Sequence, residues 1–262
     1  MSLSAWVGRT AGKPGVENAV AEEQVASDHD GRPITVRRDT TYPLLVDREQ
    51  VIASEHFGVL RSRILNMQSK SGIRSLIITS AQKGEGKSLI SVNLALSLAQ
   101  LERHRILLVD GDLRVKGISR LLKMEGDPGV SDFLRGTRAM ENCIRPTNLS
   151  HLFVAGAGTQ AEDALPAILE GSRWPTFLEQ AKEVADLVIV DSVPVAAPIA
   201  DFELLAAPCD ATFLVVHLRK TTRAALAVTM QQMDRKLMGV IVNNQEPRMG
   251  QEYYSYYYGK KK

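Results

Sequence analysis

The sequence predicts an α/β domain with a doubly wound, mostly parallel sheet that is covered by helices on both faces. Short apolar runs of strand length recur along the chain, and segments with helical periodicity lie between several of them. Continuous apolar strands that alternate with helices are typical of parallel sheets. The apolar runs are Leu76–Ile78, Ile106–Val109, Leu152–Val154, Leu187–Val190, Phe213–Val216 and Val240–Val242.

The remaining elements follow from the same periodicity. Apolar residues at helical spacing predict a helix from Asp47 to about Met67, which the Ser69–Gly72 stretch ends. Further helices are expected at Leu89–Leu101, Trp174–Ala185 and Ala224–Leu237. The first 41 residues have few periodic apolar side chains, so we expect a disordered arm at 1–41, a domain at 42–248 and a tail at 249–262.

Composition excludes several classes of protein. The 262 residues are 44% hydrophobic and 24% charged with a net charge of +2, which argues against collagen-like, fully disordered and coiled-coil chains. This balance gives no bulk signal for nucleic acid or membrane attraction. Cys143 and Cys209 lack metal-like spacing and fit a reducing compartment. With no uncharged apolar stretch of 18 residues and no signal peptide pattern, we expect a cytoplasmic protein.

A phosphate-binding loop is predicted between the first strand and the next helix. The stretch Ala81–Ser88 reads AQKGEGKS, in which two glycines would let backbone amides approach phosphate oxygens. Lys87 would reach the terminal phosphates and the Ser88 hydroxyl would bind Mg²⁺. Ala81 replaces the usual first glycine of the pattern, so the alternative is a glycine-rich turn with an incidental lysine. The nucleotide-binding residues predicted here are Gly84, Glu85, Gly86, Lys87, Ser88 and Leu89, with Asn243 further along the chain.

Three aspartates follow predicted strands. Asp110 and Asp112 come after Ile106–Val109, and Asp191 comes after Leu187–Val190. Ligands bind at the carboxyl ends of strands in doubly wound sheets, so these carboxylates should converge on the phosphate loop. Oxygen ligands of this kind suit Mg²⁺, for which we expect Ser88, Asp112 and Asp191. The alternative is that the aspartates only cap the following helices.

The last ten residues contain five of the six tyrosines, followed by lysines. Tyr253, Tyr254, Tyr256, Tyr257 and Tyr258 cannot serve a core at a chain terminus. Beside a phosphate loop, a cluster of phosphoacceptors is favoured over a β-prone or nucleic-acid-stacking tail.

Together these motifs resemble the bacterial tyrosine kinases of capsule and exopolysaccharide export. The resemblance covers about residues 50–259 and includes GEGKS at 84–88, DxDxR at 110–114, VDSxP at 190–194 and the tyrosine cluster. It implies a phosphate-loop NTPase fold of the deviant Walker A type, similar to MinD and ParA, with a helical N-terminal extension. It also implies ATP-dependent autophosphorylation of the tail with ATP and Mg²⁺, in which Lys87, Asp110 and Asp112 are the catalytic residues and Asp110 accepts the tyrosine proton.

The resemblance further implies partners. These are a membrane protein of the chain-length-determinant type that recruits the kinase to the inner face of the plasma membrane, a tyrosine phosphatase, and copies of this chain, but not nucleic acid. The family's subunit-contact motif Glu-x-x-Arg-x-x-Arg is matched by Glu55 and Arg61, while Gly58 replaces the middle arginine. Two alternatives stay open: a MinD/ParA-like positioning ATPase and a catalytically weak nucleotide-binding regulatory module. The second lysine typical of the positioning ATPases would fall at Gln82 and is absent.

Overall fold

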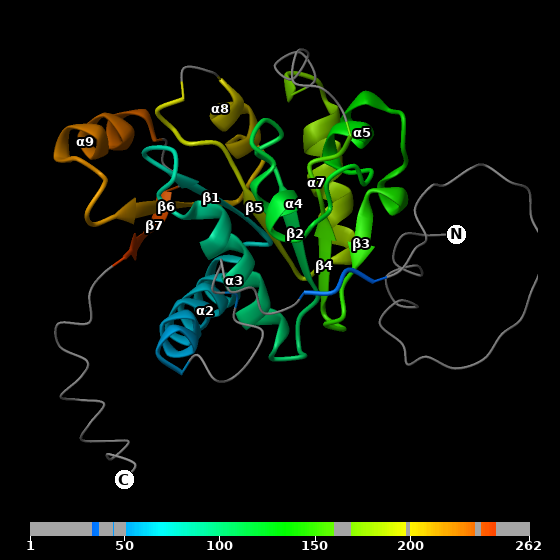
Figure 1. Ribbon diagram of the computed structural model, residues 1–262, viewed down its shortest axis with the longest axis horizontal. Coiled ribbons are helices and arrows are strands. Elements are labelled where there is room, and N and C mark those ends of the chain that lie inside the picture. The colour runs from blue at the N-terminus through cyan, green and yellow to red at the C-terminus, as the bar shows by residue number, and fades with distance from the viewer. Residues whose placement is uncertain are drawn as a thin grey trace, which may run out of the picture.

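One mostly parallel sheet organises the part of the chain that the structure, a computed structural model, describes: residues 33–36, 44, 51–159, 169–197, 200–233 and 237–244. The strands lie in the order β3-β4-β2-β5-β1-β6-β7 (Figure 1). They are β1 (Ser75–Ser80), β2 (Ile106–Asp110), β3 (Ile144–Pro146), β4 (Leu152–Ala155), β5 (Leu187–Asp191), β6 (Ala211–His217) and β7 (Leu237–Asn243). Only β3 runs antiparallel to its neighbour.

The sequence periodicity located the long helices and missed the short ones. The helices are α2 (Val51–Ser71), α3 (Lys87–Ala99), α4 (Gly117–Leu121), α5 (Val130–Arg135), α7 (Arg173–Val184), α8 (Asp201–Ala206) and α9 (Arg223–Gln232), with a 3-10 turn η1 (Met140–Asn142). Elements of five or six residues are too short to show a helical period. The helix expected at Ala224–Leu237 ends early, because Met233 has an extended backbone and Leu237 already pairs with Thr212.

Two apolar cores lie on the two faces of the sheet. Successive strand side chains point to opposite faces, so Ile78 joins the core under α2 and α3, whereas Ile77 joins the core under α5, α7 and α8. The second core contains Trp174 and Phe177, whose rings stack with centroids 5.7 Å apart. This double coverage explains why β1, β2, β4 and β5 are buried along their whole length and mostly apolar.

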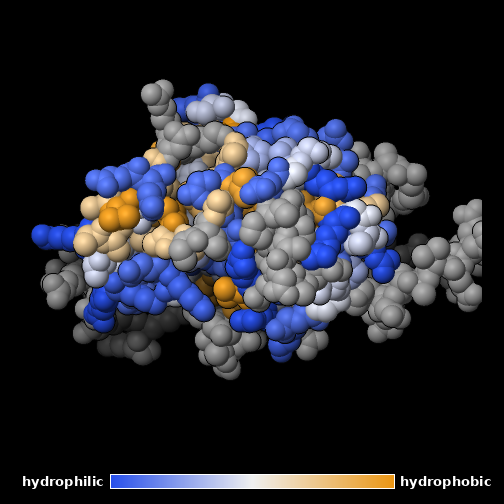
Figure 2. Space-filling view, turned by 90° about the horizontal axis from the view of Figure 1, so that it is seen from above, coloured by the Kyte–Doolittle hydropathy of each residue, from blue (hydrophilic) through white to orange (hydrophobic). Residues whose placement is uncertain are grey.

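β7 departs from the expectation of burial on both faces. It lies at the edge of the sheet, and its residues alternate between half-buried and exposed. The side chains of Met238, Val240 and Val242 are 37%, 49% and 48% exposed. With Leu218, Val228 and Met230 they account for the apolar surface at the end of the molecule that carries α9 and β7 (Figure 2).

Part of the predicted disordered arm packs against the domain. Ile34 and Val36 are buried, and Ile34 donates its N–H to the Pro146 carbonyl at 2.9 Å beside β3. Asn148 accepts the Val36 N–H on its side-chain oxygen at 2.9 Å. Residues 33–36 of the arm thus pack beside β3, and the rest of 1–41 lies outside the described residues.

In the strand order, β2 and β5 lie on one side of β1, whereas β6 and β7 lie on its other side. Ligands in such sheets bind where the strand order reverses, outside the carboxyl ends of the strands. The loop after β1 lies at this position. No helix in the described ranges combines the length and apolarity needed to cross a bilayer.

Candidate active site

The loop between β1 and α3 has the shape of an anion-binding nest. Gly84 and Gly86 adopt φ angles of +78° and +93°, in the left-handed region that favours glycine. A Cβ built on Gly86 would lie 2.3 Å from the Asn243 side-chain nitrogen, so only glycine fits there. Within the described part of the chain, the backbone N–H groups of residues 84–88 have no hydrogen-bond partner. Free amides at a helix N-terminus are suited to bind phosphate.

Lys87 lies among carboxylates. It begins α3, and its Nζ lies 2.8 Å from Asp112 Oδ2 and 3.7 Å from Asp191 Oδ2. Burial alone would lower the pKa of Lys87, but Asp191 and Asp112 raise it above its ordinary value. The lysine therefore remains charged beside these carboxylates, directly after Gly86 of the loop.

Asp191 ends β5 and is held by two serines of α3. The Ser88 hydroxyl donates to Asp191 Oδ2 at 2.5 Å, and Ser91 Oγ lies 3.3 Å from Asp191 Oδ1. Burial raises the pKa of Asp191, although Lys87 and Ser88 oppose that shift. Ser88 and Asp191, two of the residues expected to hold Mg²⁺, thus lie next to each other, while Ser91 was not foreseen.

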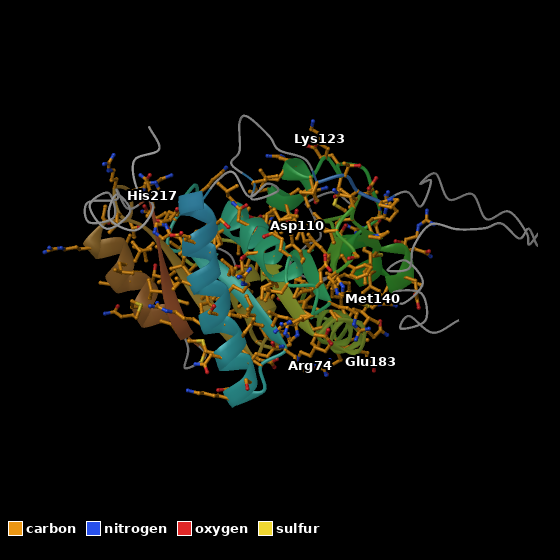
Figure 3. The ribbon with its side chains drawn as sticks, turned by 90° about the horizontal axis from the view of Figure 1, so that it is seen from below. Arg74, Asp110, Lys123, Met140, Glu183 and His217 are labelled. Carbon is orange, nitrogen blue, oxygen red and sulfur yellow. The ribbon has the colours of Figure 1, made fainter. Side chains whose placement is uncertain are left out.

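Asp110 ends β2 directly beside Asp191 in the sheet register. It is fully buried (Figure 3), and its Oδ2 accepts hydrogen bonds from the Ser119 N–H and hydroxyl, both at 2.8 Å. Its Oδ1 has no hydrogen-bond partner within the described residues. Burial and the neighbouring Asp191 raise the pKa of Asp110 to about 7. Gly111 permits this crowding, because a Cβ there would lie 2.7 Å from the Asp191 carbonyl oxygen.

This arrangement fits Mg²⁺. Three buried carboxylates, Asp110, Asp112 and Asp191, act on the single Lys87 ammonium. The buried Oδ1 of Asp110, which has no hydrogen-bond partner among the described residues, also suits contact with a cation. No group of three or more His, Cys, Asp or Glu side chains in the described ranges forms a metal site by itself. Mg²⁺ usually takes one or two carboxylates together with substrate phosphates and water, so an incomplete protein ligand set suits it.

Other predicted residues occupy supporting positions. Leu89 is half-buried against the core under α3, so its backbone N–H rather than its side chain is available to a nucleotide. Asn243 donates its side-chain N–H to the Glu85 carbonyl at 2.8 Å, which places it against the phosphate loop. Arg114 binds Asp201 of α8, with Arg114 Nε 2.8 Å from Asp201 Oδ2, and no sequence pattern pointed to Asp201.

The residues predicted for subunit contact lie on α2. Arg61 donates to the Ser97 carbonyl of α3 at 2.7 Å, so it binds within its own chain here. A Cβ on Gly58 would meet only Arg61, at 3.9 Å, so a larger residue would fit at that position. The tail tyrosines lie outside the described residues.

Comparisons with known proteins show the family to which the chain belongs. A family described as the CobQ/CobB/MinD/ParA nucleotide binding domain matches residues 76–258. The tyrosine-protein kinase YwqD of Bacillus subtilis is 32% identical over 79% of this chain and 87% of its own length. The tyrosine-protein kinase CpsD of Streptococcus pneumoniae is 30% identical over 80% and 93%. The solved BceF tyrosine kinase domain is 29% identical with a TM-score of 0.66, over 73% of this chain and 77% of that chain. The chain therefore belongs to the tyrosine-protein kinases built on the CobQ/CobB/MinD/ParA nucleotide binding domain.

Proposed function

We propose that this kinase transfers the γ-phosphoryl group of ATP to tyrosines of its own C-terminal tail, Tyr253, Tyr254, Tyr256, Tyr257 and Tyr258. The observation that carries the proposal is the combination, at the start of α3, of the unpaired amides of residues 84–88 with Lys87, whose Nζ pairs with the Asp112 and Asp191 carboxylates. A cation beside a nest of free amides is arranged to stabilise transferring phosphoryl groups.

Different residues around Lys87 would bind the phosphates, the Mg²⁺ and the rest of ATP. The loop amides and Lys87 would bind the β- and γ-phosphates, for which Lys87 would leave Asp112. Ser88, Asp112 and Asp191 would hold Mg²⁺, which when bound neutralises phosphate charge and favours departure of the ADP oxygen. Asn243, at the edge of the loop, would border the rest of the nucleotide.

Asp110 would receive the tyrosine proton. The tyrosine oxygen forms a bond to the γ-phosphorus while the bond to the ADP oxygen breaks, and the hydroxyl proton passes to Asp110 Oδ1. A tyrosine pKa of about 10 against an ordinary aspartate pKa of about 3.9 makes this transfer uphill by about 8 kcal/mol. Burial and the neighbouring Asp191 raise the pKa of Asp110 to about 7 in the metal-free protein, which lowers this cost to about 4 kcal/mol before any effect of Mg²⁺. The proton therefore moves late, as the phosphoryl group arrives.

We further propose that the kinase regulates the polymerisation and export of an extracellular polysaccharide. The resemblance to kinases of capsule and exopolysaccharide export supports this role. On the same ground, a membrane chain-length-determinant protein would recruit the kinase to the inner face of the plasma membrane, and a tyrosine phosphatase would reset it. Glu55 and Arg61 would contribute to self-association.

Phosphotyrosine formation on the purified protein with Mg-ATP, mapped by mass spectrometry, tests the proposal. A fragment of the membrane partner should be added in a parallel sample. Lys87→Met should abolish labelling, because it removes the phosphate-binding cation while keeping side-chain bulk. Lys83→Met is the matched control, since Lys83 lies in the same loop with an exposed side chain.

The outcomes separate the three functions. Phosphotyrosine in the tail that depends on Lys87 and not on Lys83 supports the kinase. ATP hydrolysis without phosphotyrosine would indicate a positioning ATPase. Nucleotide binding without either reaction, with the partner present, would indicate a regulatory module.

A further inference from the structure

Glu85, in the middle of the phosphate loop, is a buried carboxylate whose side chain bonds to the protein itself. It is 0% exposed, although it lies between two glycines in the loop. Its Oε2 accepts the Gln82 N–H at 2.9 Å, which closes the loop from residue 82 to residue 85. A negative charge beside a phosphate site would repel the ligand unless it is held elsewhere.

Thr221 is the second partner of Glu85. The Thr221 hydroxyl accepts the His217 N–H at 2.9 Å, which leaves its single proton for donation to Glu85 Oε1. His217 ends β6 (Figure 3), and its carbonyl accepts the Thr221 N–H at 2.9 Å. The donor is therefore held by a tight turn before α9 and not by a mobile side chain alone.

Two further contacts tie the same loop to the same region. Lys220, beside Thr221, donates to the Lys83 carbonyl at 2.7 Å. Asn243 donates to the Glu85 carbonyl at 2.8 Å and lies opposite His217 in the pairing of β6 with β7. Residues 83 and 85 of the phosphate loop thus bond to the β6–α9 turn and to the end of β7, which are more than 130 residues away in the sequence.

We infer that Glu85, Thr221 and Asn243 form a clamp that holds the phosphate loop in its anion-binding shape, so that the β6–α9 turn and the end of β7 set nucleotide affinity. None of these residues needs to touch the reacting atoms. The clamp fixes Gly84 and Gly86 in their left-handed conformations before the ligand arrives, so the loop amides need not be ordered at the moment of binding.

The clamp also links the nucleotide site to the tail. Asn243 is the last residue of β7, Asn244 after it has a φ of +56°, and the tyrosines begin ten residues after Asn243 in the sequence. Anything that draws Asn243 away from Glu85 should loosen the loop. Because such coupling is reciprocal, bound nucleotide should in turn hold Asn243, at the end of β7, against Glu85.

Thr221→Val tests the clamp, because it keeps the side-chain shape and leaves Glu85 Oε1 buried without its donor. Titration with Mg²⁺ and a non-hydrolysable ATP analogue should show a dissociation constant raised about 10- to 100-fold, as expected for a lost hydrogen bond to a charged group. Thr221→Ser restores the hydroxyl and should bind within about threefold of the wild type. In the kinase assay, the KM for ATP should rise more than kcat falls.

Thr222→Val is the matched control. Thr222 is the next residue and caps α9 by accepting the Ala225 N–H at 3.1 Å, without contact to the loop. The substitution Thr222→Val should lower the melting temperature of the protein and leave its nucleotide affinity unchanged. Wild-type affinity in Thr221→Val, or an equal loss in Thr222→Val, would overturn the clamp.

Two more variants keep the test decisive. If Thr221→Val does not fold, Thr221→Ala removes the same hydroxyl without changing the charge of Glu85 and should weaken nucleotide binding, whereas unchanged affinity would refute the clamp. Asn243→Ala combined with Thr221→Val should weaken binding by less than the product of the single effects, because both act through Glu85. Independent effects would show that Asn243 acts outside the clamp. Binding is measured without tyrosine transfer, so the clamp, which builds on the proposed nucleotide site, can fail while the kinase assignment survives, and the reverse.

Discussion

The two ends of the strands in the central sheet place aspartates in opposite surroundings. At the amino ends, Asp186 and Asp210 are partly exposed, accept backbone N–H groups and pair with cations. At the carboxyl ends, Asp110 and Asp191 lie side by side with burial raising the pKa of both. Aspartates therefore stabilise the folded protein at the amino ends of the strands and, in their charged form, destabilise it at the carboxyl ends.

At the amino edge, which Arg74 marks in Figure 3, Asp210 Oδ2 accepts the Arg74 and Ser75 N–H groups at 2.9 and 2.8 Å. Asp186 accepts the Arg105 N–H at 2.8 Å. Burial would raise the pKa of both carboxyls, but these hydrogen bonds hold the pKa of each below its ordinary value. Both aspartates thus fix the start of a strand.

At the carboxyl ends of the strands, three carboxylates lie near the single ammonium group of Lys87. Asp110 has one orphaned oxygen, and Lys87 is the cation shared by three carboxylates. Perturbed carboxylates of this kind cluster at functional sites, where a ligand completes the arrangement. The contrast teaches that the structural aspartates of this fold are partly exposed and satisfied by their neighbours, whereas the functional ones are fully buried and crowded together.

The largest expected effect is on catalysis. Asp110→Asn keeps the shape but removes the proton acceptor, so turnover should fall about 10²- to 10⁴-fold while nucleotide affinity falls less. Asp186→Asn is the control at the opposite edge and should leave turnover within about threefold. The measurement is the initial rate of tail phosphorylation with Mg-ATP, and a normal rate in Asp110→Asn would make Asp110 purely structural.

The next effect is a pH-dependent gain in stability from the same variant. The folded pKa of Asp110 lies near 7 and above its ordinary 3.8, so the folded state binds the extra proton between these values and wild-type stability falls as pH rises through that window. Asp110→Asn removes this cost. In metal-free buffer its advantage should be absent near pH 4 and reach up to roughly 4 kcal/mol at pH 8. Denaturant unfolding across pH measures it, and an advantage that shrinks with rising pH would contradict the account.

Asp210→Ala should act in the opposite direction. Loss of the acceptor for the Arg74 and Ser75 N–H groups should cost about 1–3 kcal/mol of unfolding free energy at neutral pH. Because the folded pKa is lowered, the contribution of Asp210 is present above its ordinary value of 3.8 and is lost as pH falls below it. The difference between variant and wild type should therefore narrow in acid, and a constant difference would rule out a role for the charge.

The smallest effect tests whether burial is required. Arg120 and Glu125 form an exposed pair, 3.9 Å apart, near the carboxyl edge. Glu125→Gln should change the free energy of unfolding by less than about 0.5 kcal/mol, since exposed ion pairs contribute little. A larger change would mean that location alone, rather than burial and crowding, sets the energetics of this edge.

The main elements of the fold could be predicted because they depend on local patterns. Strands buried on both faces leave apolar runs, and the GEGKS stretch and the aspartates after strands are visible in order along the chain. β3, α4, α5 and α8 could not be found, since three to six residues carry no period. The exposure of β7 depends on its edge position, which no local pattern encodes.

The supporting residues of the site were missed for a different reason. Ser119 binds Asp110, Thr221 binds Glu85 and Asp201 binds Arg114, and none of these belongs to a recognisable spacing. Their roles arise only when distant segments meet, as between residues 85 and 221. A serine or threonine at such a place looks like any turn residue in the sequence.

The most direct test of the central claim is the unfolding free energy at pH 8 with and without Mg²⁺ and a non-hydrolysable ATP analogue, for wild type and Asp110→Asn. The account predicts that the variant is the more stable protein without ligand. It also predicts that ligand stabilises the wild type more, because only there does the cation relieve repulsion between Asp110 and Asp191. A variant that is less stable without ligand, or an equal gain from ligand in both proteins, would contradict the claim that this edge is built to be completed by Mg-nucleotide.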